Sequence, residues 1–211
     1  MNSIEIFDTF ALKYDQWFDK YKFVYESEII ALKKFVPKNG NGLEIGVGTG
    51  RFAVPLGIRT GVEPAHAMAA IARRRGIDVY YAKGEKLPFS SESFSFILFV
   101  TTVCFLENPL ESLREATRVL MPDGYIIIGM IDAASPLGKV YEKTKTGSTF
   151  YRHARFYTVP QVTEWLKALE YKHIKTCQTI FHPIEEITTL ETVKRGYGEG
   201  SFVAIAARKR K

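Results

Sequence analysis

The chain has 211 residues, of which 46% are hydrophobic and 25% are charged, a balance typical of a globular domain rather than of a disordered or fibrous protein. The net charge of +6 is mild, and much of the basic excess lies in residues 73–75 and 208–211. We interpret these as a solvated helix end and a tail rather than as a nucleic-acid surface. No apolar run is long enough to span a membrane. The two cysteines, Cys104 and Cys177, lie far apart, which excludes a disulfide framework and a multi-cysteine zinc site. We therefore expect a cytoplasmic protein that holds no metal.

The N-terminal region is predicted to be helical from about residue 7 to residue 36. An aromatic stripe recurs there at spacings of three and four, as on one face of a helix: Phe7, Phe10, Tyr14, Trp17, Phe18 and Tyr21. Pro37 and the glycines at 40 and 42 end the helical pattern. The stripe indicates either a permanent core face or the inner face of a lid.

Strand-like and helix-like segments then alternate. Strands are predicted at 43–47, 60–63, 78–81, 94–102 and 125–131, with helices at 64–75 and 109–120. Segment 94–102 is nearly all apolar, as a strand buried on both faces should be. Pro55 and Gly57 interrupt the first connection, so its helix should be stunted. The alternation predicts an α/β fold with a parallel sheet that is wound by right-handed crossovers.

The pattern loosens after Asp132. Residues 133–157 show no clear periodic element, and a helix is predicted at 160–169. Strands are predicted at 173–181 and 201–207, which can form an antiparallel pair at the edge of the sheet.

The first strand ends in a turn of alternate glycines, Gly46, Gly48 and Gly50, and the second strand ends at Glu63. Ligands bind beyond the strand ends of such a sheet. A dinucleotide site needs glycine at position 51, which is Arg51 here, and no P-loop sequence occurs. A nucleoside without phosphates fits better, because Glu44 would repel pyrophosphate and attract an ammonium group, while Glu63 suits the hydroxyls of a ribose.

These stretches resemble the class I S-adenosylmethionine (SAM)-dependent methyltransferases, specifically the branch that acts on small molecules. The resemblance rests on residues 43–50, 61–63, 85–89 and 118–124, and on residues 14–18, which look like the lid helix of the family. It implies a Rossmann-like, doubly wound sheet of seven strands, mostly parallel with an antiparallel C-terminal strand. It also implies SAM as cofactor and methyl transfer to a small-molecule acceptor by in-line displacement.

The resemblance divides one domain of residues 1–211 into a helical lid (1–38), a cofactor-binding core (39–132), and an acceptor-side region with edge strands (133–211). It implies that the glycine turn lines the methionine and ribose portion of the cofactor, with Glu44 near the ammonium group and Glu63 on the ribose. The remaining implied cofactor contacts are Pro64 and Met68 at the adenosine, Gly84, Glu85 and Leu87 at the adenine edge, and Phe99 and Thr101 at the methionine.

The acceptor side offers only isolated candidates. Tyr14 belongs to the predicted lid, and His153 is either an acceptor-site base or a surface histidine. Cys104 is either a nucleophile or a small buried hydrophobe. Lys83 stands where the family often has Asp, and a lysine cannot accept a hydrogen bond from the adenine amino group.

Two alternatives remain at this stage. One is a non-catalytic nucleoside-binding module of the same fold, and the other is a nucleic-acid methyltransferase. The positive charge motivates the second, but no basic face with interleaved aromatics supports it. Nothing in the sequence selects the acceptor, the methylated atom or the oligomeric state.

Overall fold

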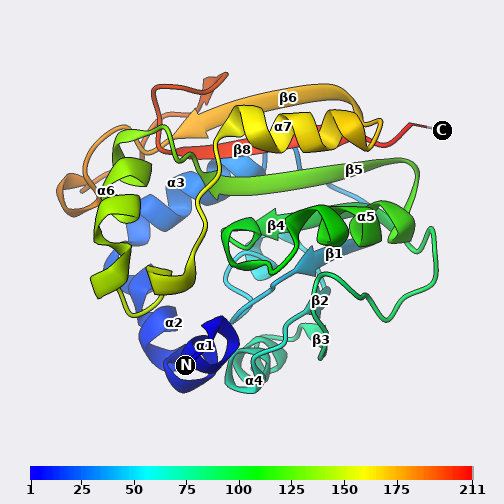
Figure 1. Ribbon diagram of the computed structural model, residues 1–211, viewed down its shortest axis with the longest axis horizontal. Helices are drawn as coiled ribbons and strands as arrows, with labels where there is room; N and C mark the ends of the chain where they lie inside the picture. The colour runs from blue at the N-terminus through cyan, green and yellow to red at the C-terminus, as the bar shows by residue number, and fades with distance from the viewer. Residues whose placement is uncertain (211) are drawn as a thin grey trace.

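One sheet of eight strands forms the centre of the protein in the computed structural model, which describes residues 1–210 (Figure 1). The strand order is β3-β2-β1-β4-β5-β8-β6-β7. The strands are β1 (Gly42–Ile45), β2 (Thr60–Val62), β3 (Asp78–Tyr80), β4 (Phe94–Val100), β5 (Leu120–Ile131), β6 (Lys172–Thr179), β7 (Lys194–Arg195) and β8 (Phe202–Arg208).

The pairing confirms the predicted Rossmann-like sheet. β1 to β5 are parallel to one another, and β8 is antiparallel to both β5 and β6. β2 and β3 lie on one side of β1, and β4 and β5 lie on its other side. At this reversal of the strand order, a crevice opens between the carboxyl ends of β1 and β4. The two-residue strand β7 is additional to the seven strands that the resemblance implies.

Helices cover both faces of the sheet. The face with α3 (Lys22–Leu32), α4 (His66–Arg74) and the single turn η1 (Val54–Leu56) buries one apolar cluster. The other face, with α5 (Pro109–Val119) and α7 (Val159–Ala168), buries a second. η1 is the stunted connection that the sequence predicts. None of the helices in residues 1–210 is long and apolar enough to cross a membrane.

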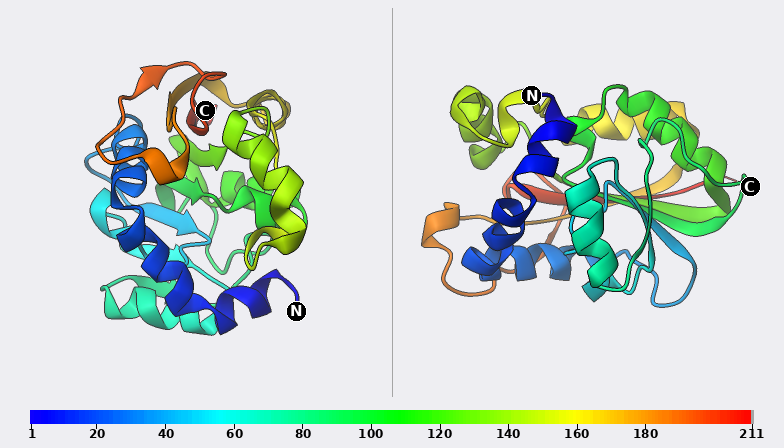
Figure 2. Two further views of the ribbon diagram at one scale, coloured as in Figure 1. Left: turned by 90° about the vertical axis from the view of Figure 1, so that its left-hand side faces the viewer. Right: turned by 90° about the horizontal axis from the view of Figure 1, so that it is seen from below.

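The N-terminal region forms α1 (Ser3–Thr9), α2 (Ala11–Lys20) and α3. α1 and α2 run diagonally across one end of the sheet, and α6 (Pro136–Thr144) stands beside them at the same end (Figure 2). By contrast, α3 packs on the sheet itself, against β5, β6 and β8. Of the residues 1–38 predicted as a lid, α1 and α2 lie across the end of the sheet (Figure 2), whereas α3 buries its apolar side chains against the sheet.

Two elements differ from the sequence prediction. Residues 133–157 contain α6 and the short turns η3 (Lys145–Gly147) and η4 (Tyr151–His153). The sequence does contain a start signal for α6. The hydroxyl of Ser135 accepts a hydrogen bond from the amide of Gly138 as an N-cap, and a proline follows at the first helical position. β5 begins at Leu120 rather than at residue 125, because Leu120 already pairs with Phe94 of β4. The turn expected at residues 122–124 is instead an irregularity inside this strand.

Phe202 provides a test of the core. It is 0% exposed, and a Cβ added to Gly129 would lie 2.7 Å from its ring. Phe202→Ala should therefore lower the free energy of unfolding in urea by roughly 3–5 kcal/mol. Tyr197→Ala, at a side chain that is 49% exposed, should change it by no more than about 0.5 kcal/mol. Equal effects of the two substitutions would show that β8 is not packed as described.

Candidate active site

The turn after β1 is folded back onto β2. The amides of Gly46 and Val47 both donate to the carbonyl of Val62, at 2.8 and 3.0 Å. Gly46 and Gly48 have φ values of +70° and +56°, in the left-handed region that favours glycine. A Cβ at Gly46 would lie 2.4 Å from Thr102. The turn therefore exposes its backbone to the crevice and admits no side chain there.

Glu63 joins this turn to the end of β2. Its side-chain oxygens accept from the amides of Gly48 and Ala65, each at 2.9 Å. The residue is 7% exposed. Burial raises the pKa of Glu63 to about 7, although the two amide hydrogen bonds oppose the shift. The carboxyl group is thus fixed in position with lone pairs left for a ligand.

Glu44 lies behind the turn. Its neighbours Leu43 and Ile45 point into the cluster under α5 and α7, so the alternation of β1 turns Glu44 to the opposite face. The side chain is 1% exposed and its Oε2 has no hydrogen-bond partner. Burial, reinforced by the charge of Glu63, raises the pKa of Glu44 well above its usual value. An unpaired buried carboxylate favours a cationic ligand group beside it.

A cleft of about 430 Å³ opens at the crevice. Of the residues predicted to contact the cofactor, those that line it are Gly46, Gly48, Glu63, Pro64, Met68, Gly84, Glu85 and Thr101. Tyr14 and His153, the candidates for the acceptor side, line it as well. These residues come from four strand ends, from α2, from α4 and from η4, so tertiary structure brings them together.

Four predicted contacts lie outside this lining. Phe99 is fully buried in the core, on the same face of β4 as Ile97, so its side chain does not line the cleft. Leu87 is also a core residue, and its amide donates to Glu115. A Cβ at Gly50 would meet Ala72 of α4, so this glycine permits close helix packing. Glu44 stands behind the turn, as described above.

Several lining residues were not predicted. Asn2, Ser3, Ile4 and Phe7 come from the start of the chain, and Thr102, Phe105, Leu106, Glu107 and Arg155 come from later loops. Phe7 belongs to the aromatic stripe, so the sequence held a signal for it. The loop residues follow no periodic pattern. Lys83 also lines the cleft, and its ammonium group is 2.8 Å from a carboxylate oxygen of Glu107.

Tyr14 stands over the glycine turn. A Cβ at Gly48 would lie 3.7 Å from its ring. Burial raises the pKa of Tyr14 above its usual range, and the charges of Glu44 and Glu63 add to the shift. Its hydroxyl interacts with Thr101, a non-glycine residue held at φ +49°. Such strain is often found at functional sites.

Four charged residues hold α2 against the turn. Arg51 pairs with Asp15 and Asp19, each at 2.8 Å, and Arg75 pairs with Asp15 at 2.7 Å. Arg75 also donates to the carbonyl of Thr49 at 2.6 Å. Partial burial raises the pKa of Asp15, but hydrogen bonds from Arg75 and Arg51 outweigh it and lower the pKa well below the usual value. We call Asp15, Asp19, Arg51 and Arg75 the ionic clamp. Arg51, which stands at the position where a dinucleotide site has glycine, belongs to it.

His153 and Cys104 flank the acceptor side. His153 is exposed, and its Nε2 lies 2.8 Å from the carbonyl of Met1, so it contacts the start of the lid. Burial raises the pKa of Cys104 to about 12. Its thiol is therefore protonated near neutral pH and is not a nucleophile.

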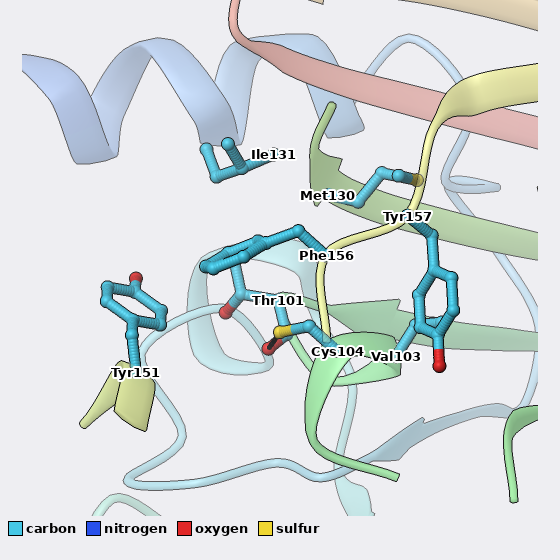
Figure 3. A pocket seen from close by; sticks show the side chains of 8 residues that line it. All are labelled: Thr101, Val103, Cys104, Met130, Ile131, Tyr151, Phe156 and Tyr157. Carbon is cyan, nitrogen blue, oxygen red and sulfur yellow. Dashed lines mark hydrogen bonds between the residues drawn. The ribbon is translucent and has the colours of Figure 1, made fainter. Parts of the chain in front are cut away.

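A small recess of about 20 Å³ adjoins the cleft (Figure 3). Thr101 lines both spaces. The other lining residues are mostly apolar or aromatic: Val103, Cys104, Met130, Ile131, Tyr151, Phe156 and Tyr157. Rings from α1 pack beside the cleft, since Phe7, which lines it, packs on Phe105 and Phe150 at centroid distances of 5.0 and 5.5 Å.

Comparison with known proteins shows where this arrangement recurs. The family model of a methyltransferase domain matches residues 43–128. An uncharacterised protein of Methanocaldococcus jannaschii is 53% identical over 206 residues, covering 98% of this chain and 100% of that protein. A SAM-dependent methyltransferase of Thermotoga maritima, described as a possible histamine N-methyltransferase, has a TM-score of 0.95 and 46% identity, covering 98% of this chain and 99% of that chain.

The fold defines an α/β protein with an open cleft at the switch point of the sheet. With the matches above, the chain belongs to the class I SAM-dependent methyltransferases, and it is an enzyme that uses SAM as its cofactor. The residues present fit this cofactor. The turn at Gly46 and Gly48 leaves no side chain in the way, and Glu63 presents a fixed carboxyl group in the cleft.

Asp15 provides a test of the ionic clamp. Asp15→Asn removes the charge that both Arg51 and Arg75 contact, so the amides of residues 3–20 should exchange hydrogen faster in the ligand-free protein. Asp19→Asn is the matched control, because Asp19 pairs with Arg51 through a side chain that is 68% exposed, and its effect should be much smaller. Unchanged exchange in both variants would mean that aromatic packing alone docks the helices.

Proposed function

We propose that this enzyme transfers the methyl group of SAM to a small-molecule acceptor by in-line displacement. The observation that supports a small acceptor is the cleft of about 430 Å³, because side chains of α1 and α2, such as Phe7 and Tyr14, line it and restrict the approach of a large substrate. The description of the T. maritima relative as a possible histamine N-methyltransferase is consistent with this choice.

The proposed cofactor contacts follow from the cleft. Glu63 accepts from the ribose hydroxyls, and the backbone at Gly46 and Gly48 lies along the methionine portion, with Glu44 behind the turn near the ammonium end. Pro64 and Met68 flank the adenosine, while Gly84 and Glu85 edge the adenine. The cofactor, when bound, supplies an electrophilic methyl group on a sulfonium. Lys83 is held by Glu107, which leaves adenine recognition to backbone groups.

The proposed acceptor contacts begin at Thr101, because it lines both the cleft and the recess. Tyr14 reaches Thr101 from the lid and so closes the junction of the two spaces. Orientation of the acceptor and exclusion of water are what the protein contributes to such a transfer. His153, exposed beside Met1, is assigned to the lid contact rather than to proton transfer.

Labelled methyl transfer tests the proposal. The protein is incubated with SAM carrying a labelled methyl group and with separate small-molecule, protein and nucleic-acid fractions of a cell extract. Label should enter the small-molecule fraction, with little dependence on salt. Label in nucleic acid, with activity that falls steeply as salt rises, would instead support the nucleic-acid alternative.

Glu63→Ala should weaken the binding of S-adenosylhomocysteine, the demethylated cofactor, at least about tenfold in calorimetry. A charge-assisted hydrogen bond is worth roughly 1.5–3 kcal/mol, and about 1.4 kcal/mol is a factor of ten. Glu111→Ala, on the exposed surface of α5, is the control and should bind normally. A lower melting temperature with unchanged affinity would show that Glu63 only supports the turn.

Tyr14→Ala should lower turnover by a larger factor than it lowers the equilibrium constant of folding, because the lid closes the junction only when the cofactor is bound. In the wild-type protein, amides of residues 1–20 should gain protection when S-adenosylhomocysteine binds. Equal protection with and without this ligand would reject the lid and identify the aromatic stripe as permanent core.

A further inference from the structure

Arg155 brings into the cleft a positive charge that the protein leaves unpaired. Its side chain lines the cleft and is exposed. Within residues 1–210, no carboxylate pairs with its guanidinium group and no hydrogen-bond acceptor contacts it. Lys83, which also lines the cleft, is instead neutralised by Glu107 at 2.8 Å. Arg155 therefore supplies the permanent positive charge of this lining that remains available to a ligand.

The carboxyl groups nearest the proposed cofactor are held by other groups. Glu63 accepts two backbone amides, and Glu85 accepts the amide of Asn108 at 3.1 Å. In the part of the chain that the structure describes, neither carboxyl group pairs with Arg155. An anionic ligand group would therefore meet a free guanidinium group rather than have to displace an existing ion pair.

The backbone of Arg155 is anchored to the loop after β4. Its amide donates to the carbonyl of Cys104 at 2.8 Å, and Cys104 belongs to the short turn η2 (Val103–Phe105). The thiol of Cys104 donates in turn to the carbonyl of Thr101 at 3.3 Å. Thr101 lines both the cleft and the recess. The base of Arg155 is thus fixed two hydrogen bonds away from the residue where the acceptor contacts are proposed to begin.

His153 and Arg155 face the cleft from the same side of their segment. Ala154, which lies between them, is 2% exposed and has an extended backbone. Successive side chains of extended backbone point to opposite sides, so the burial of Ala154 directs its two neighbours outward, and both line the cleft. His153 contacts the carbonyl of Met1 through its Nε2. Arg155 is therefore the member of this pair that is left for a ligand.

A free guanidinium group selects ligands by charge and by shape. Its planar fork of N–H donors matches a carboxylate or a phosphate through a pair of parallel, charge-assisted hydrogen bonds. A cationic ligand group would be repelled, and a neutral one would gain a weaker bond. Arginine keeps its charge throughout the working pH range of proteins, so this selection does not depend on a titration.

We infer that the acceptor carries an oxyanion, a carboxylate or a phosphate, which the guanidinium group of Arg155 holds while another atom of the acceptor receives the methyl group. This inference rests on the proposed small-molecule function. The lone pair of the receiving atom forms the bond to the methyl carbon, the carbon–sulfur bond breaks toward sulfur, and any proton displaced from that atom passes to solvent.

The oxyanion is the recognised group and not the methylated one. Pairing with Arg155 stabilises its negative charge, and methylation of the same group would cancel that charge and lose the interaction in the transition state. Arg155 is thus a specificity-determining residue that acts on the acceptor and leaves the cofactor to the glycine turn and Glu63.

Identification of the labelled product tests the chemistry of the acceptor. The small-molecule fraction of a cell extract is incubated with the protein and methyl-labelled SAM, and the labelled product is identified by mass spectrometry. The product should contain a carboxylate or phosphate that is not itself methylated. A product without an oxyanion, or with its oxyanion methylated, would overturn the inference and leave the small-molecule function intact. No label in this fraction would refute the small-molecule function itself.

Arg155→Gln tests the residue with the same fraction as the probe. The amount of the fraction that gives the half-maximal rate should rise at least about tenfold, with little change in the maximal rate. Arg155→Lys keeps the charge and should recover part of the loss. Arg152→Gln is the matched control, because Arg152 is an exposed arginine of the same segment that donates to the carbonyl of Ser148 and does not line the cleft. It should behave as the wild type does, and equal behaviour of Arg155→Gln would overturn the inference.

The carboxylate of the cofactor is the other oxyanion within this cleft, and calorimetry separates the two sources. The probes are S-adenosylhomocysteine and methylthioadenosine, which lacks the amino-acid portion. Both should bind Arg155→Gln as they bind the wild type. Weaker binding of S-adenosylhomocysteine alone would place Arg155 on the cofactor and overturn its assignment to the acceptor.

Discussion

The cleft of this enzyme depends on the join between the glycine turn and the end of β2. The carbonyl of Val62 accepts the amides of Gly46 and Val47, and the carboxyl of Glu63 accepts the amide of Gly48. Because the two strands are parallel and adjacent, these bonds place a backbone turn and a fixed carboxyl group side by side. The cofactor site is thus built from main-chain geometry, and the side chains around it refine its fit.

The lid is attached to this turn by two kinds of interaction. Arg51 and Arg75 bind Asp15 through charge, and Tyr14, Phe7 and Phe18 contribute ring contacts. The charged contacts are directional and fix where α2 sits, whereas the rings exclude water from the junction at Thr101. Arg51 directly follows the glycine turn and pairs with Asp15 and Asp19 of α2. A shift of the turn on cofactor binding would therefore move α2 through this one residue.

Glu44, behind the glycine turn, is a buried carboxyl group, and its Oε2 has no hydrogen-bond partner. Burial and the neighbouring Glu63 both disfavour its charged form, so the group costs stability in the free protein. The chain therefore gives up stability behind the turn that lines the cleft, which is a common feature of binding sites.

The sequence by itself determined the order of the strands and helices, the stunted η1, and the glycine turn with Glu63, because periodicity and turn residues act over short stretches of chain. It did not determine that Phe99 and Leu87 are core residues or that α3 leaves the lid and packs on the sheet. It also missed α6, β7 and the ring contacts of η4. These depend on which side of a strand or helix faces a partner far away in the chain. The recess exists only where η2, the end of β5 and η4 meet, so only the tertiary structure decided it.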